Sequence, residues 1–156
     1  MRPRGWLRLI AFSKIWLMFH HEATKSTKGT KASALVLSHA IIGSAIEVHR
    51  LMGPGLLESV YEVALCKELW LRGISVERQV SVPVSYKGES LNCEVKLDLL
   101  VEKSVVVEVK AVDKLISVHT AQLLTYLRLQ DLWLGLLINF NVNSLREGLR
   151  RVLNGW

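Results

Sequence analysis

The chain has 156 residues, half of them hydrophobic, so it is long enough for one domain with a real core and too short for two ordinary domains. Its formal net charge of +6 comes from residues 1–33, where seven Lys or Arg stand against Glu22 alone. Residues 34–156 carry 13 basic and 13 acidic residues, a net charge of zero. This balance excludes a globally basic domain, so any case for nucleic acid depends on a local site.

The first 33 residues differ from the rest and are interpreted as a non-core extension, disordered at least in part. Residues 7–19 are mostly apolar after an arginine-rich start, as in a signal peptide. Ser13 and Lys14 interrupt this run, and it lacks both a cleavage pattern and the length of a membrane span, so we expect no membrane insertion. Residues 22–33 form a polar Thr/Lys tract that buries too little apolar surface to order itself. The folded domain is expected over residues 34–156.

Two helices are predicted at the start of this domain. Apolar residues recur at helical spacing over about 35–51, and a second helical pattern follows over 57–71, after a Gly-Pro-Gly turn. His39 and His49 lie ten residues apart on the first helix, too far to share a cation, so we interpret them as structural. Glu58 occupies the first turn of the second helix. An acid there stabilises the helix dipole, and it can equally point into a site.

Three strands joined by short connections are predicted next, as an antiparallel meander. Residues 74–86 alternate between apolar and polar side chains, with Pro83 marking an edge or a bulge. Residues 91–101 run back and lead into 105–109. Cys93 in this region and Cys66 in the preceding helix have no metal-ligand spacing, which indicates buried, reduced thiols in a cytoplasmic protein.

The hairpin formed by the last two strands carries acids and a lysine on one face. Side chains alternate along a strand, so Glu108 and Lys110 point to the same side. If the turn is a three-residue loop centred on Lys103, Asp98 lies opposite Glu108, with their Cβ atoms about 4.5–5.5 Å apart. That separation suits two carboxylates that hold one cation. The alternative is a solvated strand face with an ion pair of little energetic value.

The remaining chain predicts a helix, a strand and a short helix. Residues 117–129 form a helical pattern that places Gln122 and Tyr126 on one stripe. Residues 133–140 are an almost unbroken apolar run, as expected for a central strand covered on both faces. Residues 144–153 are read as a short basic amphipathic helix.

The order of these elements and their motifs resembles the PD-(D/E)xK nuclease superfamily. The motifs are Glu58, Asp98, Glu108-Val109-Lys110 and Gln122-x-x-x-Tyr126. More narrowly, residues 38–153 resemble the small GxxExxY family through the segments Gly53–Tyr61, Asp98–Val101, Glu108–Ala111 and Leu136–Phe140. One departure is Lys96, where that pattern would have arginine; the charge is kept and the planar fork is lost.

The resemblance implies a mixed α/β (α+β) fold with a restriction-endonuclease-like core. It consists of a three-stranded antiparallel meander plus a further strand, flanked by helices. The implied activity is metal-dependent hydrolysis of DNA phosphodiester bonds. The implied catalytic residues are Glu58, Asp98, Glu108 and Lys110, and the implied ligands of Mg²⁺ or Mn²⁺ are Asp98, Glu108 and Glu58. Hard carboxylate oxygens suit these ions, and Lys110 would orient or activate the attacking water.

Gln122 and Tyr126 would position the substrate, and their alternative is a polar stripe on a surface helix. The implied partner is nucleic acid, DNA in preference to RNA, in DNA repair or in defence against foreign DNA; a homodimer is left open. The alternative function is a catalytically silent nuclease-fold module for binding or assembly. The neutral domain favours that module, because phosphate contacts normally supply most of the affinity for nucleic acid. The acids occurring together with Lys110 favour the enzyme.

Overall fold

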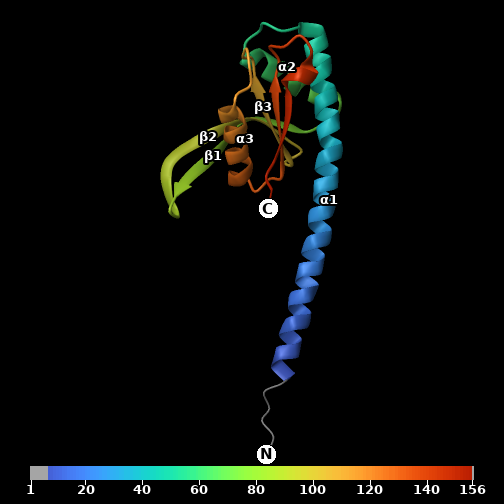
Figure 1. Cartoon of the computed structure of the whole chain (residues 1–156), viewed down its shortest axis with the longest axis vertical. Helices are drawn as coiled ribbons and strands as arrows, with labels where there is room; N and C mark the ends of the chain where they lie inside the picture. Colours follow the sequence, from blue (N-terminus) through green and yellow to red (C-terminus); the bar gives the residue numbers. More distant parts are fainter. Residues whose placement is uncertain (1–6, 156) are drawn as a thin grey trace, which may run out of the picture. The chain divides into compact units, whose positions relative to one another are not determined.

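The computed structural model describes the backbone of residues 7–155 and the side chains of residues 30–155 (Figure 1). Contacts divide the chain into two units, Met1–Ser33 and Ala34–Trp156, and the second unit is the domain considered below. The helical elements are α1 (Leu7–Met52), α2 (Glu58–Leu71), α3 (Ser117–Leu129) and the 3₁₀ turn η1 (Leu145–Gly148). The strands are β1 (Val76–Tyr86), β2 (Glu89–Val101), β3 (Val105–Lys110), β4 (Leu134–Asn139) and β5 (Leu149–Leu153).

In the described part of the chain the strands form one five-stranded sheet in the order β1-β2-β3-β4-β5. β1, β2 and β3 pair antiparallel, which confirms the predicted meander. β4 joins parallel to β3 and is buried along its whole length, which confirms the predicted central strand. β5 adds antiparallel to the far side of β4. The predicted mixed fold is therefore correct, with one strand more than expected.

Helices cover both faces of this sheet (Figure 1). Residues 34–52 of α1 and helix α2 pack on one face, in a core cluster that includes Ile41 and Leu65. α3 packs on the other face, in a cluster that includes Leu123. Gly135 of β4 allows this close approach, since a Cβ there would lie 2.8 Å from a methyl carbon of Leu123. Alternate side chains of β3 enter the two clusters. The strand that carries Glu108 is therefore packed on both faces of the sheet.

The predicted start of the first helix is wrong. The α1 backbone is helical from Leu7 rather than from about residue 35, and it continues through the polar tract 22–33. Once a helix is nucleated, each further residue adds a hydrogen bond, so a polar tract can extend a helix that it would not begin. The apolar side chains of residues 7–19 lie outside the described residues.

The predicted C-terminal helix is also wrong, because residues 149–153 form strand β5. At the end of η1 the chain passes so close to β4 that a Cβ on Gly148 would lie 2.1 Å from the carbonyl oxygen of Asn139. β5 then pairs with β4 and satisfies backbone groups that an open edge would leave unpaired. This tertiary pairing outweighs a helical pattern that is only a few residues long.

One described helical stretch, Thr30–Met52, is long and apolar enough by composition to cross a membrane. Ala34, Ile41, Ala45 and Val48 on this stretch are buried in the core of the domain. Packing on the sheet accounts for these four residues, while Val36 and Leu51 of the same stretch are exposed.

The histidines and cysteines differ in burial. His49 Nε2 lies 2.8 Å from the carbonyl oxygen of Val142, which supports its structural interpretation, whereas His39 is exposed and its role stays a prediction. Cys66 is half-buried. Cys93 is exposed on the outer part of the β1–β2 hairpin, so the prediction of a buried thiol there is wrong. Both thiols are free.

We predict that removing residues 1–33 leaves the domain folded, because contacts divide the chain at Ser33 and the core begins at Ala34. Thermal melts of the full chain and of residues 34–156 should differ by less than about 4 °C, the shift that about 1 kcal/mol produces in a chain of this size. A much lower melting temperature, or aggregation of the shortened chain, would show that the extension packs on the domain.

Candidate active site

The site lies where β2 and β3 separate beyond their shared hairpin. The two strands pair in the register Val101–Val105, Leu100–Val106 and Leu99–Val107, which leaves the predicted three-residue loop between them. One further step in this register sets Asp98 against Glu108. At this step the Asp98 side chain takes the place of a strand partner, because its Oδ2 accepts the backbone N–H of Val109 at 2.8 Å. The register predicted from the sequence is confirmed.

Glu108 is the buried centre of the site. The residue is 2 % exposed, and Lys110 Nζ donates to its Oε1 at 2.8 Å. The second oxygen, Oε2, is buried and has no hydrogen-bond partner among the described residues. A buried carboxylate oxygen without a partner costs free energy, because it has lost its water and gained nothing in return. This oxygen is thus the point at which a bound cation would stabilise the site most.

Burial and neighbouring charges shift the pKa values of Glu108, Asp98 and Lys110. Burial, followed by the charge of Asp98, raises the pKa of Glu108 to about 7. Burial also raises the pKa of Asp98, by more than the Val109 N–H lowers it. Burial lowers the pKa of Lys110, but the hydrogen bond to Glu108 and the nearby acids outweigh burial, so the net shift is upward. The site therefore holds a charged lysine beside two carboxyl groups whose ionised forms burial makes unfavourable.

Glu58 reaches the end of β3 from the first turn of α2. It is exposed, and its Oε1 accepts the backbone N–H of Ala111 at 3.2 Å. Tyr61, one turn later, is buried: its hydroxyl donates to the carbonyl of Gly53 at 2.6 Å, and its ring stacks on Phe140 with centroids 4.5 Å apart. Tyr61 therefore fixes the Gly-Pro-Gly turn before α2, and that turn sets the position of Glu58.

Glu62 is a further acid at this end of the sheet, and the sequence analysis missed it. It is buried and accepts from Arg78 Nε at 2.6 Å and from Gln79 Nε2 at 2.9 Å. Gln79 Nε2 also lies 3.5 Å from Asp98 Oδ1, so this amide stands between two acids. A signal was available, since Glu62 follows Glu58 by four residues and therefore shares its helical face.

Gln79 reaches Glu62 because the β1 backbone is distorted at this residue. Its φ is 52°, in the left-handed region that residues other than glycine seldom adopt. In a regular strand Arg78 and Gln79 would point to opposite faces, whereas here both donate to Glu62. Such an outlier survives where the surroundings hold it, and it often marks a functional site.

Gln122 and Tyr126 are bonded to each other. Gln122 Nε2 donates to the Tyr126 hydroxyl at 2.7 Å, so their predicted pairing on one stripe of α3 is confirmed. Tyr126 is buried and belongs with Val106 to the second core cluster. The alternative interpretation, a polar stripe exposed to solvent, therefore does not describe Tyr126. Within the described residues, neither side chain hydrogen-bonds to Asp98 or Glu108. Their role toward substrate remains a prediction.

The free oxygens of the site fit a hard divalent cation in part. Lys110 holds one oxygen of Glu108, and the Val109 N–H holds one of Asp98. Among the residues described, Glu108 Oε2 has no partner and Asp98 Oδ1 has only the 3.5 Å contact to Gln79. Mg²⁺ is commonly held by one or two carboxylates with waters, which matches this pair. Among residues 30–155 no group of three or more His, Cys, Asp or Glu could hold a metal, so direct ligation by Glu58 stays a prediction.

We predict that Gln79→Gly is more stable than Gln79→Ala by about 1 kcal/mol, because both lose the amide and only glycine adopts φ near 52° without strain. Chemical denaturation of the two variants measures this difference directly. If alanine were the more stable of the two, the backbone at this residue would not be strained.

We predict that Glu108→Gln stabilises the protein by about 1–3 kcal/mol at pH 8 in chelator, because the amide resembles the protonated carboxyl that burial favours. The unfolded carboxyl ionises near its ordinary pKa of 4.5 and the folded one near 7. Wild-type stability should therefore fall as pH rises from about 4.5 to 7, and the gap to the variant should open over that interval. Asp98 and Lys110 are present in both proteins, so the variant differs from wild type chiefly in the carboxyl group of residue 108. Denaturation at pH 5 and pH 8 tests this, and a gap that is equal at both values would contradict it.

Comparison with known proteins places this geometry in a family. A family model of the PD-(D/E)XK nuclease superfamily matches residues 36–152, which include every site residue discussed above. No curated protein and no solved structure matches the chain significantly. The match covers most of the domain, and the sheet with flanking helices is consistent with the restriction-endonuclease-like fold of that superfamily. The chain therefore belongs to the PD-(D/E)XK nuclease superfamily.

Proposed function

We propose that the protein is a metal-dependent nuclease that hydrolyses phosphodiester bonds of DNA. The observation that carries this proposal is the buried Glu108 Oε2, which has no partner among the described residues and lies beside Asp98 and Lys110. A protein that used this acid only for stability would not leave the oxygen unsatisfied. Membership of the nuclease superfamily supports the same conclusion.

The residues divide into three roles. Asp98 and Glu108 would hold Mg²⁺ or Mn²⁺, which when bound supplies charge neutralisation at the phosphate and a more acidic water. Lys110 orients the attacking water and offsets charge on the scissile phosphate. Its side chain is 13 % exposed and anchored on Glu108, so the ammonium is held at the edge of the site. Glu58 accepts the backbone N–H of Ala111 at the end of β3, and its carboxylate would bind a second ion or a water.

The cellular setting is part of the same proposal. The resemblance to the GxxExxY family supports a role in DNA repair or in defence against foreign DNA, with DNA preferred over RNA. The two free thiols suit the cytoplasm. Gln122 and Tyr126, joined on α3, would position the substrate strand.

A second candidate function is a binding or assembly module that has kept the fold without turnover. Two observations favour it: residues 34–156 have no net charge, and the described residues contain no group of three potential metal ligands. In that case Lys110 would serve only to neutralise Glu108. The two functions differ in one testable respect: only in the nuclease does Lys110 affect the rate of DNA cleavage.

We predict that Lys110→Ala lowers DNA cleavage by about 10²–10⁴-fold and leaves metal affinity largely intact, because Lys110 is not a ligand. Asp98→Asn should weaken metal binding, while its amide oxygen still accepts the Val109 N–H and preserves the fold. Calorimetric titration with Mg²⁺ and Mn²⁺ measures affinity, and cleavage of single- and double-stranded DNA with either ion or chelator measures activity.

The matched control is Lys103→Ala, which removes an exposed lysine at the other end of the same hairpin. It should leave cleavage and metal affinity unchanged. A large fall in metal affinity in Lys110→Ala would contradict the assigned role. If wild type and all variants are equally inactive on every DNA and RNA tested, the non-catalytic module becomes the better description.

A further inference from the structure

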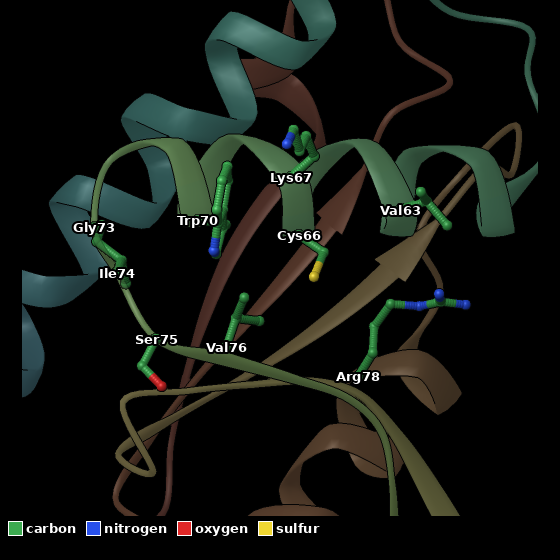
Figure 2. A pocket seen from close by; sticks show the side chains of 9 residues that line it. All are labelled: Val63, Cys66, Lys67, Trp70, Gly73, Ile74, Ser75, Val76 and Arg78. Carbon is green, nitrogen blue, oxygen red and sulfur yellow. The ribbon is translucent and has the colours of Figure 1, made fainter.

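An open groove of about 640 Å³ lies between α2 and the start of β1 (Figure 2). Its apolar lining includes Val63, Cys66 and Val76. Trp70 of α2 also lines the groove, and Figure 2 shows its indole directed toward the strand side. This tryptophan is 64 % exposed, which is unusual for so large an apolar side chain on a helix that packs on a core. Burial in the domain therefore does not explain Trp70.

The charged residues that line the groove are all basic. Two of its lining residues are charged, Lys67 and Arg78, and both are basic. Lys67 Nζ lies 4.0 Å from the centroid of the Trp70 ring, so a cation stands next to the aromatic surface. Arg78 pairs with Glu62 through Nε and stays 43 % exposed on its side chain, so its terminal nitrogens can meet a phosphate. The domain as a whole is neutral, and the groove is a local exception.

One end of the groove lies next to residues that border the candidate active site. Arg78 closes it at one end, and the next residue, Gln79, contacts both Glu62 and Asp98. Trp70 lies eight residues beyond Glu62 on α2, about 12 Å along a helix axis. At about 3.4 Å per stacked nucleotide this distance corresponds to three or four nucleotides. A strand segment of that length spans the distance from Glu62 to Trp70.

We propose that this groove binds unpaired nucleotides of a single DNA strand, with a base stacked on Trp70 and phosphates on Lys67 and Arg78. Sequence-tolerant sites for single strands combine basic side chains with aromatic stacking surfaces, which are the two features present here. A paired base inside a duplex cannot reach the indole, so the groove selects single-stranded DNA next to the scissile phosphate. This proposal rests on the nuclease function and adds its substrate class.

Binding of a fluorescein-labelled oligo(dT) strand and of a blunt duplex of equal length to the full chain, measured by anisotropy in chelator, tests the proposal. Trp70→Ala should weaken binding of the strand by about 5- to 100-fold, the range found when a stacking residue is lost, and should leave duplex binding unchanged. Trp70→Phe keeps an aromatic face and should lose less. The matched control is Leu71→Ala, which removes an equally exposed residue of α2 that does not line the groove.

The basic extension is present in every variant, so its contribution to DNA binding cancels in the comparison. Equal strand binding by wild type and Trp70→Ala, an equal loss on the duplex, or the same loss in Leu71→Ala would overturn the proposal. A Trp70-dependent affinity for oligo(rU) above that for oligo(dT) would overturn the assignment to DNA.

Because binding is measured without metal, the two proposals fail separately. Trp70-dependent strand binding without any cleavage would support the groove and contradict the nuclease. Cleavage by wild type, with strand binding and kcat/KM unchanged in Trp70→Ala, would support the nuclease and contradict the groove.

Discussion

The hydrogen bond from the Val109 backbone to Asp98 is the interaction on which the geometry of the site depends. It replaces a strand partner, so β2 can leave β3 while its acid stays attached. β3 does not follow, because it pairs with β4 along its whole length and the Phe140 N–H donates to the Lys110 carbonyl at 2.8 Å. Glu108 and Lys110 are thereby carried on a strand that is held from its other edge. Their side chains are largely buried where the two strands separate.

Asn139 extends this rigidity beyond the strand. It is buried at the end of β4, and its side-chain amide accepts the Val112 N–H at 3.0 Å and donates to the Val112 carbonyl at 2.7 Å. Both backbone groups of Val112, in the segment that leaves β3, are therefore hydrogen-bonded as they would be in a strand. Glu58 bonds to the backbone of Ala111 in the same segment. The candidate site is built on paired strands and anchored chain, which holds catalytic groups in position better than free loops do.

The meander, the β2–β3 register and the central strand could be predicted, because alternation and loop length fix them locally. β5 could not, because Leu-Arg-Arg-Val-Leu suits a helix face as well as a short strand, and only the free edge of β4 decides. The spacing from Glu58 could have placed Glu62 on the same helical face, but its partners could not be predicted. They come from β1 through the backbone distortion at Gln79, and glutamine at that position does not indicate a positive φ.

The two outer strands of the sheet have consequences for how copies of this domain can associate. β1 is one edge, and it contains Pro83, which lacks an N–H, followed by a break in register before Ser85. β5 is the other edge, and its outward side chains include Arg150 and Arg151. Both features discourage a further strand from adding to a sheet. Extension of the sheet from molecule to molecule, the first step toward fibrils, is therefore opposed at both edges.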